Sequence, residues 1–173
     1  MYIQIKKYRT FVPTNFVITI MKIEEIIKSN VSLDDAKRVI LNLMYTQNVV
    51  AEKFYETIKP FDLSGEQYNV LRILRGQKGN PANMCAIQER MITKNSNTTR
   101  LIDKLLAKDL VTRNVCPENR RKMEILITEK GLALLQELDP IVAAHEQLFA
   151  QNLTPTEQTM LIELLEKFRT INN

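Results

Sequence analysis

The chain has 173 residues, of which 45% are hydrophobic and 25% charged, and its formal net charge at pH 7 is +4. This composition is typical of an ordinary globular protein and excludes a low-complexity chain. No apolar run approaches the ~20 residues of a membrane-spanning helix, so we expect a cytoplasmic protein without a membrane partner.

Catalysis and metal binding are disfavoured by the residue types that the chain contains. The single histidine, His145, and the two cysteines, Cys85 and Cys116, give no metal-ligand spacing and no CxxC pair. No nucleophile, base and orienting group can be matched, and no phosphate-binding loop is present. We therefore expect no enzyme activity, no cofactor and no metal. Cys85 is predicted to be a small buried hydrophobe, and Cys116 a turn residue rather than a redox sensor.

Residues 1–31 differ in character from the rest, and we interpret them as an N-terminal extension. A short apolar run faintly resembles a signal peptide, but Pro13 and Asn15 interrupt it and no small-residue cleavage site follows. Met21 is a more natural beginning, so residues 1–20 are expected to be a disordered extension or to precede the native start. An arm that contributes to a dimer is the alternative.

A long helix is predicted from Leu33 to Ile58, where apolar residues follow helical spacing until Pro60 ends the helix. A helix of this length ahead of a small domain usually packs across a subunit or domain boundary. Ser64 and Gln67 have the spacing of a capping box, which begins a second helix that ends near Gly76.

The stretch from Asn83 to Leu106 has the pattern of a helix-turn-helix. Asn83 is suited to cap a short helix over Met84–Met91, and a polar turn leads into a second helix over Ser96–Leu106. The second helix has an apolar face and a polar face, and amide and guanidinium groups on a polar face can meet base edges in a DNA major groove. The candidate DNA-contacting residues here are Lys94, Asn95, Ser96, Asn97, Thr98, Thr99, Arg100 and Lys104.

Two short strands are predicted next, over Val111–Val115 and Met123–Thr128. The hairpin between them carries three consecutive cations, Arg120, Arg121 and Lys122. A run of cations is usually a solvated turn, but a basic hairpin directly after a helix-turn-helix is typical of a winged helix. We therefore favour DNA contact for these three residues.

The charge distribution supports this interpretation. Ser64 to Thr128 contains twelve Lys and Arg against six Asp and Glu, whereas Glu129 to Asn173 contains three against seven. The cations are concentrated on the candidate DNA-binding head, as expected for a protein that binds phosphates.

The last part of the chain is predicted to form two helices. Thr128 is suited to cap a long helix that starts at Glu129, with a kink or a break at Pro140. Thr154, followed by a proline and then by Glu157, is a strong start signal for a final helix that ends near Thr170.

Three of these features together resemble the MarR family of bacterial transcription regulators. They are the recognition-helix stretch from Ser96 to Leu105, the wing sequence Pro117-Glu118-Asn119-Arg120-Arg121, and the following Leu126-Ile127-Thr128-Glu129-Lys130-Gly131. The family's wing usually has the pattern Asp-Pro-x-Asp-Arg-Arg before a strand that ends Leu-Thr-x-x-Gly. This chain departs from it at Cys116 and Asn119, where the family has acidic residues.

The resemblance implies a mainly α (α+β) fold, a winged helix-turn-helix with a two-stranded wing, flanked by N- and C-terminal dimerisation helices. It implies a single domain over residues 32–173, with the head at 60–130 and dimerisation helices at 32–58 and 129–172. It also implies a homodimer that reads a pseudo-palindromic operator in double-stranded DNA. Each recognition helix would enter a major groove, and Arg120 or Arg121 would reach the flanking minor groove.

We therefore predict a DNA-binding transcriptional regulator, a repressor that responds to a small aromatic or phenolic effector. The candidate effector-binding residues are Tyr45, Asn48, Tyr68 and Arg72. A winged-helix protein-interaction module without DNA binding is the alternative, but such a wing would tend to carry apolar or acidic residues in place of its arginines.

Overall fold

The structure is a computed structural model that describes residues 21–116 and 119–170, except for the side chains of residues 116–122. The chain forms two compact units, Met1–Gln47 and Asn48–Asn173. The boundary predicted between residues 31 and 32 stays a prediction.

The described part of the first unit contains one short helix and the first half of a long one. Helix α1 (Ile23–Ile26) was not predicted, and it is held by the burial of Ile23 and by an ion pair of 2.8 Å between Glu24 and Arg38. Helix α2 (Asp35–Ile58) begins two residues later than predicted, because Asp34 Oδ1 accepts a hydrogen bond from the Lys37 amide (2.8 Å).

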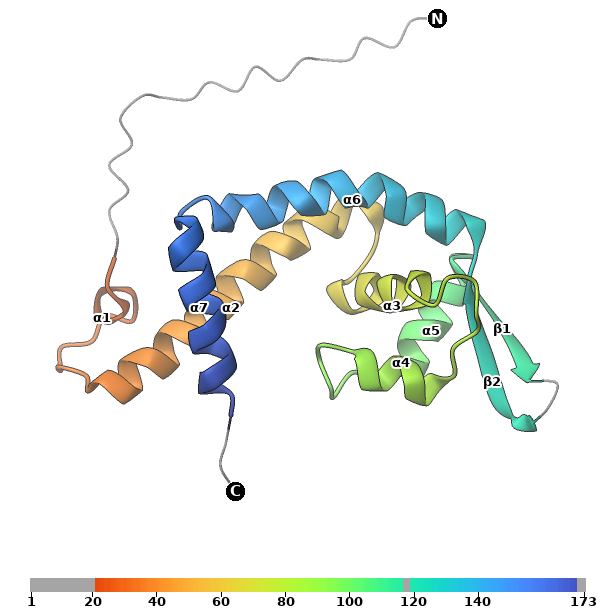
Figure 1. The fold of residues 1–173 in the computed structure, drawn as a ribbon, viewed down its shortest axis with the longest axis horizontal. Coiled ribbons are helices and arrows are strands. Elements are labelled where there is room, and N and C mark those ends of the chain that lie inside the picture. The colour runs from red at the N-terminus through yellow and green to blue at the C-terminus, as the bar shows by residue number, and fades with distance from the viewer. Residues whose placement is uncertain (1–20, 117–118, 171–173) are drawn as a thin grey trace, which may run out of the picture. The chain divides into compact units, whose positions relative to one another are not determined.

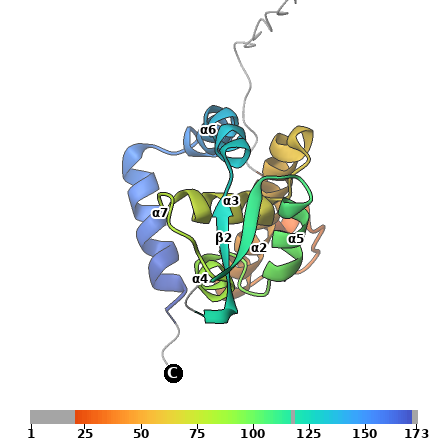
Figure 2. The same cartoon turned by 90° about the vertical axis from the view of Figure 1, so that its right-hand side faces the viewer.

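The second unit is mainly helical with a two-stranded antiparallel sheet, as predicted (Figure 1). After α2 come η1 (Lys59–Phe61), α3 (Gly65–Arg75), α4 (Met84–Arg90), α5 (Thr98–Leu106), β1 (Val111–Cys116), β2 (Asn119–Ile127), α6 (Glu129–Ala150) and α7 (Pro155–Phe168). Helices α3 and α4 contact β2, and α5 contacts β1, of the β hairpin that forms the wing (Figure 2). None of the described helices is long and apolar enough to cross a membrane.

Side-chain caps set the starts of four helices at the predicted residues. Ser64 and Thr154 each form a complete capping box, with Gln67 and Glu157 respectively. The Asn83 side chain accepts a hydrogen bond from the amide of Ala86 at the start of α4, and Thr128 caps α6 in the same way. Each cap satisfies a backbone donor that the first turn of a helix leaves without a partner.

The core of the second unit lies where α3, α5, α6 and the base of the sheet meet. The residues whose side chains are completely buried come from every one of these elements, and they include Val70, Leu71, Ile102, Leu105, Ile125, Leu135 and Leu138. Burying each such side chain contributes about 1.5–3 kcal/mol. The core therefore ties the helix-turn-helix to the sheet and to α6.

The wing differs from its prediction in length. The strands pair from Val111 with Ile127 to Val115 with Met123, and then a register irregularity leads to the pair Cys116 and Asn119. The backbone that carries the three wing cations is thus part of β2 rather than of a loop, because antiparallel pairing continues past the predicted start of that strand. Ala82 and Ile125 exchange two backbone hydrogen bonds (3.0 and 2.8 Å), which attach the α3–α4 connection to the wing.

Helix α6 is not broken at Pro140, contrary to one of the two predicted outcomes. A proline removes one backbone donor from a helix interior, but buried residues on both sides, Leu138 and Val142, anchor the helix in the core. Arg75 of α3 adds a two-pronged ion pair to Asp139, with distances of 2.8 and 3.0 Å. Helix α7 ends at Phe168, two residues before the predicted end.

The fold explains why glycine occupies position 131, at the end of the segment Leu126-Ile127-Thr128-Glu129-Lys130-Gly131. It lies in the first turn of α6 and is buried. A Cβ atom at this position would lie 2.4 Å from the Leu110 carbonyl oxygen and 2.8 Å from Ile127 Cγ1. The backbone of α6 therefore approaches the backbone at Leu110, just before β1, more closely than a side chain at position 131 permits.

Substitution Gly131→Ala is expected to destabilise the fold by about 1–3 kcal/mol, the usual cost of overpacking, because the backbone at Leu110 must shift. Urea denaturation measures this change. Gly65→Ala is the matched control, since its nearest neighbour, Phe54, would lie at an ordinary contact distance of 3.6 Å. Equal stability of the two variants would contradict the close approach.

Candidate nucleic-acid interface

One face of α5 is directed away from the core. Thr98, Ile102 and Leu105 are buried. The exposed residues recur at helical spacing and form a continuous stripe, which we call the α5 stripe: Thr99, Arg100, Asp103, Lys104 and Ala107. Its two cations and its hydroxyl are suited to phosphate and base-edge contacts.

Gln88 of α4 holds the turn of the helix-turn-helix in place. Its amide nitrogen donates to the Lys94 carbonyl oxygen, and its amide oxygen accepts from the Thr98 hydroxyl. Lys94 Nζ donates in turn to the Glu89 carbonyl oxygen (2.6 Å). Two of the residues predicted to contact DNA, Lys94 and Thr98, thus take part in bonds that fix the turn.

The recognition helix begins at Thr98 rather than at the predicted Ser96. Asn97 is its N-cap, and the Asn97 side chain accepts a hydrogen bond from the Arg100 amide (3.1 Å). Asn95 and Ser96 lie in the turn, with Asn95 exposed and Ser96 half-buried. The cap occupies the side-chain carbonyl oxygen of Asn97, so the side-chain NH₂ group of Asn97 is the part that remains available to a ligand.

Thr98 occupies a different place from the one predicted for it. Its side chain is 6% exposed and is turned toward α4, where it binds Gln88. A buried hydroxyl in this position cannot meet a base edge, so its role is to position the helix. The neighbouring Thr99 is exposed and faces outward.

The ion pair between Asp103 and Arg113 was missed by the sequence analysis. Arg113 of β1 lies 2.7 Å from Asp103 Oδ1 and so joins the α5 stripe to the wing. It also neutralises the one carboxylate on the stripe, which would otherwise repel phosphates. In the sequence, the position of Asp103 four residues after Thr99 indicated that its carboxylate faces outward, but only the fold shows that its partner lies on β1.

The wing cations Arg120, Arg121 and Lys122 lie outside the described side chains, and their predicted DNA contacts stay a prediction. Their backbone belongs to β2.

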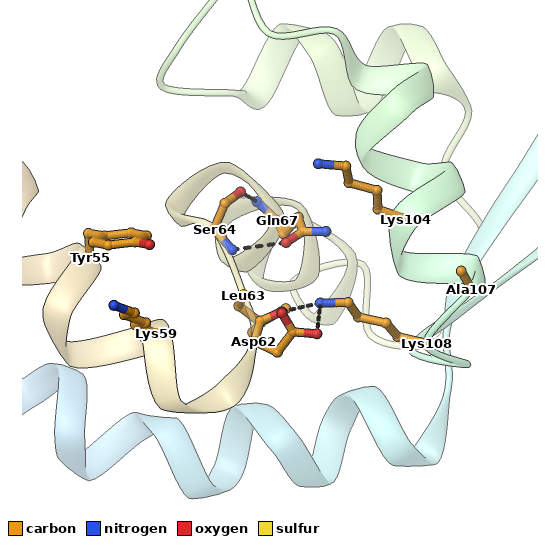
Figure 3. A pocket seen from close by; sticks show the side chains of 9 residues that line it. All are labelled: Tyr55, Lys59, Asp62, Leu63, Ser64, Gln67, Lys104, Ala107 and Lys108. Carbon is orange, nitrogen blue, oxygen red and sulfur yellow. Dashed lines mark hydrogen bonds and ion pairs between the residues drawn. The ribbon is translucent and has the colours of Figure 1, made fainter.

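The predicted effector-binding residues are not brought together at one described cavity. Tyr45 belongs to the first unit, and Asn48 is exposed in the second. Tyr68 is buried, and the Arg72 guanidinium lies over its ring at 5.8 Å from the ring centroid. The described hollow of about 460 Å³ shown in Figure 3 lies elsewhere, between η1, the start of α3 and the end of α5.

One further expectation was wrong. Cys85 is exposed rather than buried, because it lies on the outer side of α4 while Ile87 faces the core. His145 is 9% exposed and lies between the rings of Phe54 and Phe149, with ring centroids 5.3 and 5.4 Å away.

Comparison with known proteins agrees with this geometry. Residues 63–123 match the model of the MarR family. This match runs from the residue before the α3 cap to the wing. The chain is 33% identical to a MarR transcription factor from Planctomyces limnophilus, with a TM-score of 0.62 and coverage of 78% of this chain and 98% of that one.

The chain belongs to the MarR family of transcription regulators. Its 30% identity to the uncharacterized HTH-type transcriptional regulator YkoM of Bacillus subtilis covers 68% of this chain and 75% of that one. The structure of Bordetella bronchiseptica BpsR, described for the regulation of its DNA binding by 6-hydroxynicotinic acid, is 25% identical. It superposes with a TM-score of 0.68 over 77% of this chain and 99% of BpsR. In this MarR-family chain the winged helix is the DNA-binding element.

Two neighbouring threonines of the recognition helix are expected to respond differently to the same change. Thr98→Val leaves Gln88 without its hydroxyl donor and should cost about 1–2 kcal/mol of unfolding free energy. Thr99→Val, on the exposed stripe, should change stability by no more than about 0.5 kcal/mol. Urea denaturation of both variants provides the measurement, and an unchanged stability of Thr98→Val would show that its hydroxyl does not hold the helix.

Proposed function

We propose that this protein is a sequence-specific regulator that binds a pseudo-palindromic operator in double-stranded DNA as a homodimer. The observation that carries the proposal is the α5 stripe, in which Thr99, Arg100 and Lys104 face outward from a helix whose other face is locked into the core. A helix held in this way can present its side chains to the major groove at a fixed angle.

The residues that precede the α5 stripe in the sequence add to this surface. Asn95 is exposed in the turn, and Asn97 presents its NH₂ group at the helix start. Amide groups and arginine are the groups that discriminate between bases. We propose that Asn95, Asn97, Thr99 and Arg100 read bases, and that Lys94 and Lys104 contact phosphates.

The wing is proposed to contact the flanking minor groove through Arg120 and Arg121, with Lys122 near the DNA backbone. The support is the sequence of three cations on β2, whose partner strand β1 is attached to the recognition helix by the ion pair of Arg113 and Asp103. Cations in the minor groove respond mainly to its width and to its negative potential.

The exposed apolar residues of the long helices support a homodimer. Helix α7 has 14 residues and buries none of them within the chain. Leu161, Leu164, Leu165 and Phe168 recur along it at helical spacing and are 37–56% exposed. On α2, Val39, Ile40, Leu43 and Met44 are 40–59% exposed. Apolar area of this extent is typical of a protein–protein interface, and we propose that a second copy covers it.

The response to a small molecule is proposed by analogy. BpsR, to which the chain is 25% identical, is described for control of its DNA binding by 6-hydroxynicotinic acid. We propose that this protein is a repressor released from DNA by a small aromatic or phenolic acid, with Tyr45, Asn48, Tyr68 and Arg72 as the residues predicted from sequence to bind it.

DNA binding is expected to depend steeply on salt and on Arg100. With about 6–10 phosphate contacts, affinity for a duplex selected from random DNA should fall ~10³–10⁵-fold between 50 and 200 mM salt. Arg100→Ala should cost about 1–3 kcal/mol on the selected duplex. Arg121→Ala should instead weaken selected and scrambled duplexes alike and lower the salt slope by about 1. Fluorescence anisotropy titrations at two salt concentrations measure each effect.

Arg100→Lys is the matched control for that experiment. It keeps the charge but loses the two-pronged geometry of the guanidinium, so it should retain binding to the scrambled duplex while losing preference for the selected one. A flat salt response in the wild-type protein would instead favour the protein-interaction module.

The dimer is expected to depend on the exposed stripe of α7. Leu161→Glu combined with Leu164→Glu places two charges in the proposed interface, and the protein should then run as a monomer. Light scattering at about 10 µM compares these species, given a chain mass of 20.1 kDa. Glu163→Gln on the same helix is the control and should leave the dimer intact. A wild-type monomer that still binds DNA tightly would contradict the proposal.

A further inference from the structure

A second hollow, of about 540 Å³, lies between α4 and the start of the recognition helix, and we call it the α4–α5 hollow. Met84, Cys85 and Glu89 of α4 line one side of it. Asn97, the cap of α5, and Thr99 in its first turn line the other. All of these residues belong to the second unit. Because Thr99 is also part of the α5 stripe, the hollow adjoins the surface that is proposed to bind DNA.

The α4 side of the hollow presents apolar groups on an otherwise polar surface. Cys85 is exposed, and a free thiol behaves as a small apolar side chain. Met84 is half-buried and packs against the core, which holds it in place. Thr99, which carries a methyl group beside its hydroxyl, is exposed on the α5 side. The hollow is therefore suited to an apolar group of a ligand rather than to a strongly solvated one.

The two sides of the hollow are held at a fixed separation. Gln88 of α4 also lines the hollow, and its side-chain amide binds both the Lys94 carbonyl oxygen and the Thr98 hydroxyl. The Asn97 cap holds the first turn of α5 in the same place through the Arg100 amide (3.1 Å). A recess built in this way needs little rearrangement to receive a ligand, so its shape can discriminate between ligands.

Glu89 makes the hollow unsuited to a backbone phosphate. Lys94 Nζ binds the backbone carbonyl oxygen of Glu89 (2.6 Å), and no described cation lies within 4.0 Å of the Glu89 carboxylate. A carboxylate without a paired cation repels phosphate groups, and the sugars are attached to those phosphates. The part of DNA that remains as an occupant is the edge of a base.

Thymine is the base whose major-groove edge carries an apolar group, its 5-methyl group. We propose that the α4–α5 hollow receives the 5-methyl group of a thymine in each half-site, in contact with Met84, Cys85 and Thr99. The proposal rests on the proposed operator binding. It adds α4 to the elements that determine sequence preference, whereas the base contacts proposed above come from α5 and from the turn before it.

The first test removes the methyl group from the DNA and leaves the protein unchanged. A duplex is selected from random DNA with the wild-type full-length chain, and its thymines are replaced by deoxyuridine, one position at a time in both half-sites. Uracil keeps every hydrogen-bonding group of thymine. Burial of one methyl group corresponds to about fourfold in affinity, so at one position the double replacement should weaken binding about fifteenfold.

Fluorescence anisotropy titrations under a reducing agent, which keeps Cys85 a thiol, measure this ratio between the thymine and uracil duplexes. If no position changes the affinity by more than about twofold, no methyl group is buried and the proposal is overturned.

The second test assigns the methyl contact to the hollow. Cys85→Ser replaces the apolar thiol by a polar hydroxyl, and Thr99→Ser deletes one methyl group while keeping the hydroxyl. Each should lower the ratio at the sensitive position, and the double variant should bring it below about threefold, because the coupling is lost when either partner is removed. Thr93→Ser is the matched control and should keep the full ratio, since Thr93 is exposed in the turn and does not line the hollow.

The outcomes separate this site from the function on which it rests. If selection enriches no sequence, the proposed function is overturned and the site with it. If an operator is enriched and a uracil-sensitive position exists, but the double variant keeps the wild-type ratio, the methyl group is read elsewhere. That result overturns the assignment of the hollow and leaves the proposed function intact.

Discussion

Ile102 and Leu105 are completely buried on one face of α5, and this burial fixes which of its side chains face away from the protein. Each contributes about 1.5–3 kcal/mol, far more than an exposed polar contact. A rotation of the helix that brought Thr98 outward would remove this apolar surface from the core. The composition of the α5 stripe is therefore a consequence of core packing.

Polar contacts then fix the position of the helix more finely than apolar packing alone. Gln88 sets the turn before it, Arg113 attaches Asp103 to the wing, and Lys108 attaches its end to the loop at Asp62. Each contact joins α5 to a different neighbour. The position of the surface proposed to bind DNA therefore depends on several elements at once.

The close approach at Gly131 has a related effect at the other side of the head. Because α6 starts in contact with the Leu110 carbonyl oxygen, the wing and the first turn of α6 are held together as one body. The pair of Arg75 and Asp139 joins the same helix to α3. The proposed dimerisation helix α7 follows α6 directly, so an interface built on α7 is linked to the head through a helix that the core restrains.

The sequence by itself determined the order of the elements from α2 to α7 apart from η1, the caps at Ser64, Asn83, Thr128 and Thr154, and the winged helix-turn-helix class. These follow from local hydrogen bonding and from the spacing of apolar residues, which act within a few positions along the chain. The tertiary structure alone decided that Thr98 is buried while Thr99 is exposed, and that Asp103 has a partner on β1. The partners in these contacts, Gln88 with Thr98 and Asp103 with Arg113, lie 10 positions apart on different elements, and no pattern within one element contains the identity of a partner on another.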